Sequence, residues 1–122
     1  MDWQVDLVTP VPIGLARRKQ RGYNQAALLA FPLALAIGKP FRSQALVKAR
    51  ETPSQVGLTA AQRRENVAQA FQANTKIVAQ KSVLIIDDVT TSGATIEACC
   101  MALIRAGARQ VYGLTLARSK MN

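Results

Sequence analysis

Histidine is absent from this 122-residue sequence, and cysteine occurs only as the adjacent pair Cys99 and Cys100. Neighbouring residues on a helix point in different directions, so this pair favours neither a disulfide nor a shared metal ion. Without histidine and without a spaced Cys-x-x-Cys pair, a zinc site or a catalytic Cys/His pair has no ligands. The sequence therefore predicts no protein-held metal, and we interpret both cysteines as small apolar residues of a packed helix.

Aromatic residues are also scarce, at 5% of a chain whose hydrophobic share is 49%. We therefore expect one domain over residues 1–122, with a core built mainly from Val, Leu, Ile and Ala. The longest apolar stretch, Ala26–Gly38, is too short to cross a bilayer and contains Pro32. No signal peptide is recognisable at the N-terminus. A reducing cytoplasm is the expected location, without membrane insertion.

Acidic residues are few, because 7 Asp and Glu stand against 16 Lys and Arg, which gives a formal net charge of +9. A field of that sign attracts polyanions. It does not choose between nucleic acid, an anionic membrane and small phosphorylated substrates. The bases gather in two segments, Arg17–Arg21 and Lys48–Arg64.

The last third of the chain has the pattern of a β-α-β unit. Ser82–Ile86 is typical of a central strand covered on both faces. Gly93–Ala106 has helical spacing, with Gly107 where a left-handed cap belongs, and Val111–Leu116 is a second apolar strand. Such a unit is normally parallel and right-handed, so the predicted fold class is α/β.

Further elements are expected before this unit. Asn24–Ile37 is predicted as a buried helix that Pro32 kinks or splits, and it ends at Gly38. The other expectations are a strand at Val5–Val11, short strands at Ala45–Ala49 and Ala68–Phe71, a loop at Arg50–Ala61, and a short helix or turn at Gln62–Gln69.

A polar loop, Asp87–Ser92, is predicted directly after the central strand. Ligands of open parallel sheets bind outside the carboxyl ends of strands, so Asp87 and Asp88 mark a candidate site. Thr90–Thr95 then leads into a helix and offers backbone N–H groups, hydroxyls and the positive end of a helix dipole to a phosphate monoester. Since the carboxylates can accept hydrogen bonds from vicinal hydroxyls, one loop could hold both ends of a ribose 5-phosphate.

Two simpler interpretations stay open. Thr91 or Ser92 could merely cap the helix. An acidic pair after a strand also occurs at magnesium sites of receiver domains and hydrolases. The phosphate-binding patterns GxxxxGK[ST] and GxGxxG are both absent.

Val83–Thr95, VLIIDDVTTSGAT, resembles at every position the phosphoribosyl pyrophosphate motif of type I phosphoribosyltransferases. The resemblance implies a mainly parallel central sheet flanked by helices, and a ligand that is phosphoribosyl pyrophosphate with Mg²⁺. It assigns Asp87 and Asp88 to the ribose 2- and 3-hydroxyls and counts them as catalytic. The implied ligand-binding set is Asp87, Asp88, Thr90, Thr91, Ser92, Gly93, Ala94 and Thr95.

A second resemblance is to the ComF family, the competence protein F and gluconate-utilisation group. Pro10-Val11-Pro12, Arg17 and Arg21–Ala26 look like its PVP…R…RGFNQA signature, and matches continue to Arg118. That family commonly carries an N-terminal cysteine-rich, zinc-ribbon-like region, to which nothing here corresponds. We expect either a short form or a polypeptide that lacks this part.

The resemblance also implies roles in two basic loops. Arg17, Arg21 and Arg50 are expected to bind pyrophosphate. The segment from Arg50 to Arg64 resembles a mobile catalytic loop, in which Gln55 and Arg63 are expected to contact pyrophosphate as catalytic residues. A solvated surface loop is the alternative in both places.

Two functions remain open at this point. The first is an enzyme in which a nitrogen nucleophile displaces Mg²⁺-pyrophosphate from C1 of the ribose. The second is an accessory protein of DNA uptake that binds a nucleotide-like ligand, single-stranded DNA or the competence machinery. Residues able to stack on bases are few, with only Tyr23, Phe41 and Phe71 as candidates. A homodimer is a further expectation, since dimers are common among relatives.

Overall fold

The computed structural model describes residues 4–13, 22–49, 57–62, 65, 69–90 and 93–118. Its elements along the chain are β1 (Leu7–Pro10), α2 (Gln25–Ile37), β2 (Leu46–Lys48), β3 (Phe71–Ala73), α4 (Thr75–Val78), β4 (Ser82–Thr90), α5 (Ala94–Arg105) and β5 (Gln110–Arg118). No helix in these ranges combines the length and the apolar character needed to cross a lipid bilayer.

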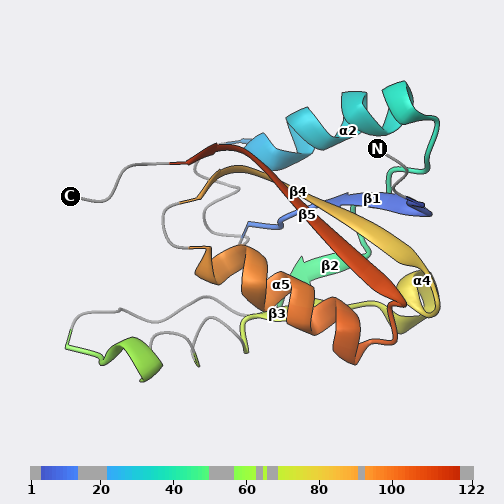
Figure 1. Ribbon diagram of the computed structural model, residues 1–122. Helices are drawn as coiled ribbons and strands as arrows, with labels where there is room; N and C mark the ends of the chain where they lie inside the picture. Colours follow the sequence, from blue (N-terminus) through green and yellow to red (C-terminus); the bar gives the residue numbers. More distant parts are fainter. Residues whose placement is uncertain are drawn as a thin grey trace.

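A parallel sheet of three strands in the order β1-β4-β5 forms the centre of the molecule (Figure 1). Leu7 pairs with Val83 and Pro10 with Ile86 on one side of β4, while Ser82 pairs with Gln110 on the other. Helix α2 covers one face of the sheet and α5 the other (Figure 1). The predicted α/β class and the predicted β-α-β unit are confirmed.

Alternation along β4 explains why the stretch Val83–Ile86 is continuously apolar. Val83 and Ile85 pack in the cluster that contains α5, whereas Leu84 and Ile86 pack in the cluster that contains α2. All four side chains are at most 4% exposed. A strand buried on both faces has no position for a solvated side chain, which is the reason for the continuous run.

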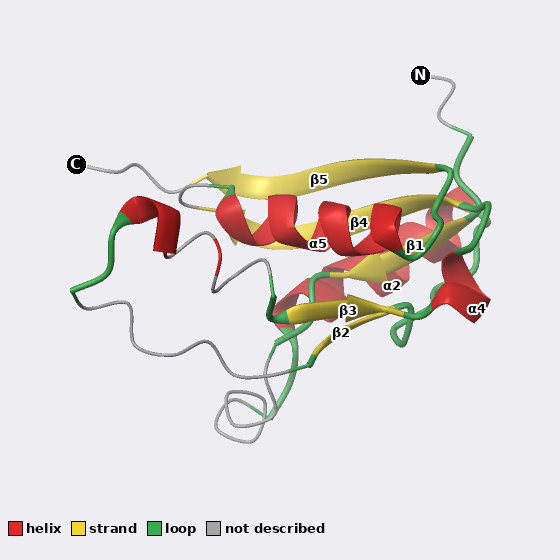
Figure 2. Cartoon of the chain, turned by 90° about the horizontal axis from the view of Figure 1, so that it is seen from below, coloured by secondary structure: helices red, strands yellow, loops and turns green. Residues whose placement is uncertain are grey.

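A small antiparallel sheet of β2 and β3 lies on the α5 side (Figure 2). β2 lies within the predicted strand Ala45–Ala49, but β3 begins at Phe71, where the strand predicted at Ala68–Phe71 was to end. Pairing with β2 determines where β3 begins, because Lys48 lies opposite Phe71 and the N–H of Asn74 donates to the carbonyl of Ala45 at 2.9 Å.

Helix α2 runs through Pro32 without interruption, so the prediction that proline splits it is wrong. Proline removes the donor to the carbonyl of Leu28, but both residues are exposed and water can hydrate that oxygen. The helix begins at Asn24, whose side chain accepts from the N–H of Ala26 at 3.0 Å. It ends as predicted at Gly38, which has a left-handed φ of 71°.

The predicted polar loop after the central strand is wrong for its first residues, because β4 continues to Thr90. Strand β5 is equally long and supplies partners there, with Asp87 opposite Thr115 and Thr90 opposite Arg118. A polar sequence can stay extended when a neighbouring strand satisfies its backbone.

Candidate ribose-phosphate site

The candidate site lies where β4 extends beyond β1. The N–H of Val11 donates to the carbonyl of Ile86 at 2.8 Å, and among the described residues the pairing of β1 with β4 ends at Pro10 and Ile86. At the level of Asp87 and Asp88, β5 still runs beside β4, whereas β1 has already ended. This edge holds the carboxyl ends of parallel strands, where ligands of such sheets bind.

The two aspartates occupy different environments. Asp87 is only 7% exposed and continues the row of Val83 and Ile85, whereas Asp88 is half-buried. The backbone N–H of Asp88 donates to Oδ1 of Asp87 at 2.9 Å. The more accessible carboxylate is thus that of Asp88.

The pKa of Asp87 is raised from 3.8 to about 6, chiefly by burial and in smaller part by a side-chain hydrogen bond with Asp88 and the charge of Asp88.

Helix α5 begins directly after this strand and points its amino end to the same edge (Figure 1). Its N-cap is Gly93, with a left-handed φ of 79° and no side-chain cap hydrogen bond. Ala94 and Thr95 form the first turn. The strand, the left-handed glycine and the helix are therefore arranged as an anion-binding turn requires.

Several predicted site residues cannot be placed. Thr90 ends β4, but only its backbone is described. The remaining predictions fall outside the described residues, namely Arg17, Arg21, Arg50, Gln55, Arg63, Thr91 and Ser92. The structure thus has Asp87, Asp88, Gly93, Ala94 and Thr95 at the same edge of the sheet, and the assignment of every site residue stays a prediction.

The structure adds Lys48 to the neighbourhood of the site. Burial is the main cause that raises the pKa of Cys99, the charge of Asp87 adds to it, and the charge of Lys48 opposes it. The charges of Lys48 on β2 and Asp87 on β4 thus both act on Cys99 of α5. A weak signal for Lys48 was available in the sequence, because this residue begins a match to the ComF pattern that runs to Thr52.

Thr9 on β1 was not singled out from the sequence either. It is fully buried, and its hydroxyl has no hydrogen-bond partner among the described residues. Its neighbours Leu7 and Val11 belong to the cluster on the α5 side, so alternation places Thr9 on the same sheet face as Asp87. The sequence feature that could have identified Thr9 is its position as a polar residue inside an apolar strand.

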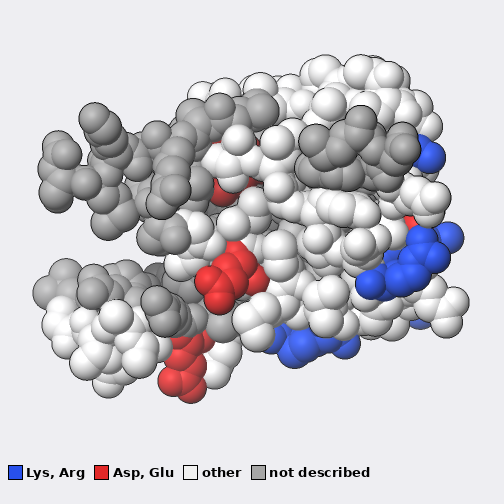
Figure 3. Space-filling view, viewed as in Figure 1, with Lys and Arg blue, Asp and Glu red and all other residues white. Residues whose placement is uncertain are grey.

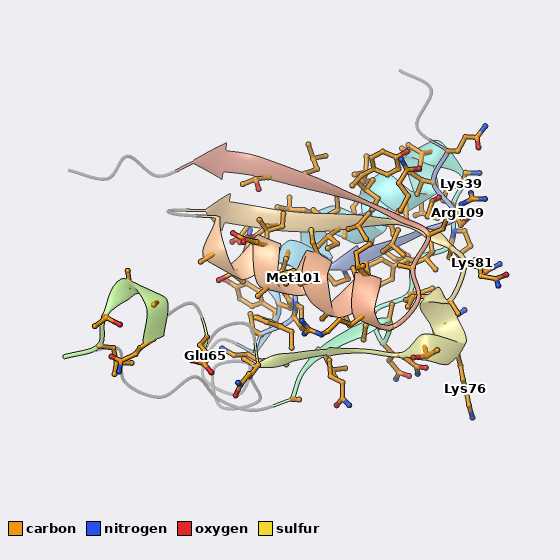
Figure 4. All side chains as sticks on the ribbon, turned by 60° about the horizontal axis from the view of Figure 1, so that its bottom comes forward. Lys39, Glu65, Lys76, Lys81, Met101 and Arg109 are labelled. Atoms are coloured by element: carbon orange, nitrogen blue, oxygen red, sulfur yellow. The ribbon has the colours of Figure 1, made fainter. Side chains whose placement is uncertain are left out.

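A group of basic residues lies at the opposite, amino-terminal end of the strands (Figure 4). Asp6 accepts from the backbone N–H of Ser82 at 2.8 Å, and this bond is the first cause that lowers its pKa. Arg109, Lys81 and Lys39 lower it further, and Arg109 lies 4.0 Å from its carboxylate. In Figure 3 positive side chains gather at this end, away from the candidate site. We call Lys39, Lys81 and Arg109 the basic cluster.

Metal ligands are limited at the candidate site. Throughout the described ranges, no three His, Cys, Asp or Glu side chains come together as a metal-binding group. Asp87 and Asp88 can thus contribute two carboxylates, and a bound cation would need its remaining oxygen ligands from water or from a ligand.

Comparison with known proteins gives three main findings. The profile of a family described as "Phosphoribosyl transferase domain" matches residues 25–120. The DNA utilization protein YhgH of Salmonella typhi is 35% identical over 114 residues, covering 93% of this chain and 50% of that protein. Competence protein F of Haemophilus influenzae is 31% identical over 116 residues, covering 93% of this chain and 51% of that protein. The chain thus spans about half the length of these curated relatives, and its ComF resemblance is confirmed.

Among solved structures, a glutamine phosphoribosylpyrophosphate amidotransferase from B. subtilis is similar, with a TM-score of 0.65 and 23% identity. The match covers 94% of this chain and 23% of that one. At this identity the match supports the fold alone, and it confirms the predicted type I phosphoribosyltransferase fold.

Proposed function

Because the chain belongs to the phosphoribosyl transferase domain family, we propose that it binds phosphoribosyl pyrophosphate with Mg²⁺ and transfers the phosphoribosyl group to a nitrogen acceptor. One observation carries this proposal. An acidic pair, Asp87 and Asp88, lies in the last part of the central strand β4, and the left-handed Gly93 that opens α5 comes after this strand. The same edge therefore offers acceptors for a diol and donors for a phosphate.

The described residues suit each part of this ligand. Asp88, half-buried and adjacent to Asp87, would accept hydrogen bonds from the ribose hydroxyls. The first turn of α5, with Ala94 and Thr95, would face the 5-phosphate, where the helix dipole favours negative charge.

Magnesium also suits this donor set. The ion usually keeps several waters and binds through one or two carboxylates together with substrate phosphates. Two carboxylates therefore match an ion carried by pyrophosphate better than an ion held by the protein alone. When bound, Mg²⁺ would neutralise negative charge on the departing pyrophosphate.

The transfer needs no covalent bond to the protein. The nitrogen lone pair bonds to C1 as the C1–O bond to pyrophosphate breaks, the bonding electrons leave with pyrophosphate, and the nitrogen releases a proton to water. Asp87 and Asp88 would fix the sugar so that C1 faces the acceptor. In this proposal Arg17, Arg21, Arg50, Gln55 and Arg63 hold the pyrophosphate.

Ligand-induced thermal stabilisation tests the binding step. We expect phosphoribosyl pyrophosphate with Mg²⁺ to raise the melting temperature of the unsubstituted chain, and the rise to disappear in the Asp87→Asn/Asp88→Asn variant. Asp6→Asn is the matched control, since it makes the same chemical change at the opposite end of the sheet and should keep the shift. An equal shift in all three proteins would refute the assignment.

Release of pyrophosphate tests the transfer step. Labelled phosphoribosyl pyrophosphate is incubated with nucleobases and with amines, and free pyrophosphate is measured. Turnover that depends on an acceptor and is lost in the same double variant would support an enzyme. Binding without turnover for any acceptor would leave a binding protein.

The basic cluster favours a second candidate function. The names of the relatives refer to DNA utilization and to competence. We propose that Lys39, Lys81 and Arg109 contact the phosphates of single-stranded DNA, in a protein that acts in the cytoplasm, where the unpaired Cys99 and Cys100 suit reducing conditions.

Because the basic cluster and the candidate site lie at opposite ends of the strands, substitutions can test the two functions separately. Salt-sensitive DNA binding should weaken in Lys39→Gln/Lys81→Gln and persist in Asp87→Asn/Asp88→Asn, as measured by fluorescence anisotropy. The reverse pattern would place DNA at the candidate ribose-phosphate site and remove the reason for the second function.

A further inference from the structure

The outer face of the small β2–β3 sheet carries a groove that the proposed function does not use. The groove has a volume of about 710 Å³, within the range of roughly 300–1,000 Å³ that is usual for small-molecule sites. We call it the β2–β3 groove. Val47 and Ala73 form its apolar lining, and its polar lining consists of Gln44, Gln72, Asn74, Thr75 and Lys76. Its size and its mixed lining therefore suit a small polar ligand.

Val47 gives the groove an apolar surface. Leu46 and Phe71 belong to the core, so alternation turns Val47 and Gln72, which lie opposite each other, to the outer face. Val47 is 43% exposed there. Proteins cover the flat face of a nucleobase with aromatic or apolar side chains, so an exposed valine beside polar groups suits a base.

Three carboxamides line the same groove, from Gln44, Gln72 and Asn74. Each carries a donor beside an acceptor, the pattern that pairs with the edge of a base. The Oδ1 atom of Asn74 accepts from the N–H of Lys76 at 3.0 Å, which leaves the NH₂ group of this side chain to donate to a ligand. The groove can therefore bind both the face and the edge of a nucleobase.

A second hollow of about 220 Å³ adjoins the β2–β3 groove. It shares Gln72, Ala73 and Thr75 with the groove and reaches Arg105 at the end of α5. Each hollow thus has one cation, Lys76 in the groove and Arg105 in the second hollow. Neither cation forms an ion pair with another described residue, and no Asp or Glu is among the residues that line the two hollows. This lining favours an anionic ligand.

We propose that the two hollows form a second ligand site, which binds a nucleoside monophosphate. The base lies over Val47 with its edge against the carboxamides, and Lys76 and Arg105 bind the phosphate. A sugar phosphate without a base would leave both Val47 and the carboxamides without a contact.

This second site is separate from the candidate ribose-phosphate site. Asp87, Asp88 and the first turn of α5 line neither hollow. In Figure 1 α4, which carries Lys76, lies at the opposite end of the molecule from the start of α5. The inference therefore does not depend on the proposed transfer, and each site can be removed without the other.

Isothermal titration calorimetry of the full chain with GMP, AMP, CMP and UMP tests the proposal. We expect Asp87→Asn/Asp88→Asn still to bind at least one of them, and to bind ribose 5-phosphate and inorganic phosphate roughly ten-fold more weakly, because these lack a base. Adding Lys76→Gln/Arg105→Gln should weaken nucleotide binding roughly ten-fold or more, since charge-assisted bonds to phosphate are lost. Lys39→Gln/Lys81→Gln is the matched control, because it removes two charges outside both hollows and should leave the affinity unchanged.

Nuclear magnetic resonance of the unsubstituted chain gives a measurement that needs no variant. The side-chain NH₂ signals of Gln44, Gln72 and Asn74 should shift as the nucleotide is added. No binding of any of the four nucleotides at millimolar concentration would overturn the proposal, and so would an equal affinity for ribose 5-phosphate. Binding that is lost in Asp87→Asn/Asp88→Asn but kept in Lys76→Gln/Arg105→Gln would also overturn it and assign the nucleotide to the candidate ribose-phosphate site. Failure of the phosphoribosyl pyrophosphate tests alone would leave this second site standing.

Discussion

The raised pKa of Asp87 predicts that the ionised carboxyl destabilises the native state, which Asp87→Asn should reveal. The pKa is 3.8 as a reference and about 6 in the folded chain, chiefly because of burial. Between these pH values the native state binds more protons than the unfolded state, so stability falls as the pH rises. Below pH 3.8 the carboxyl is neutral in both states, and above pH 6 the loss is complete.

The size of this loss follows from the shift. At about 1.4 kcal/mol per pH unit, the shift corresponds to at most about 3 kcal/mol. Water reaches the half-buried Asp88 and screens the pair from that side, so we expect about 1–3 kcal/mol. Asparagine keeps an oxygen that can accept the 2.9 Å bond from the N–H of Asp88. The Asn variant should therefore equal the unsubstituted chain at low pH and exceed its stability above pH 6.

Urea unfolding at a series of pH values measures this difference. Asp88→Asn is the informative companion, because it removes one cause of the raised pKa and should recover part of the gain. A difference between Asp87→Asn and the unsubstituted chain that is independent of pH would refute the reasoning. So would a variant that is less stable than the unsubstituted chain above pH 6.

Three further predictions concern stability away from Asp87. Thr9→Val should raise the free energy of unfolding by about 1–2 kcal/mol in chemical denaturation, because it removes a buried hydroxyl without a partner; a loss instead would mean that the hydroxyl is bonded. Asp6→Asn should lower the melting temperature at neutral pH, with a difference that shrinks as the pH falls through the lowered pKa of Asp6, since protonation removes the same ionic acceptor from Ser82; a constant difference would contradict this. Gly107→Ala should cost about 1–2 kcal/mol in the same denaturation experiment, because φ is +99° there, and an unchanged stability would show that the turn relaxes.

Local signals predicted the boundaries of the two long helices well. Asn24 caps the start of α2 by accepting a hydrogen bond from the N–H of Ala26, and Gly38 ends the helix in a left-handed conformation. Neither effect depends on residues distant in sequence. Gly107 is the same kind of signal, since the N–H of Ala108 next to it donates to the carbonyl of Leu103 at 3.0 Å. Such residues can be interpreted from a short window of sequence.

The extent of β4 and the burial of Asp87 could not be predicted in this way. The polar residues after Ile86 looked like a loop, but β5 continues alongside them and supplies their backbone partners. Asp87 is buried because it continues the row of Val83 and Ile85 toward α5, which is a tertiary property. The motif predicts a site at this end of β4, which stays a prediction, and the unequal exposure of its two carboxyls depends on packing.

The pairing of β1 with β4 has a consequence for how the chain assembles during synthesis. β4, α5 and β5 follow one another in sequence, whereas Asp6 and Ser82 meet across a separation of 76 positions. Closing so long a loop costs more entropy than forming the local unit, so β1 should dock after the other strands have formed. β1 is synthesised before β4, so its apolar residues stay accessible to chaperones until β4 has left the ribosome.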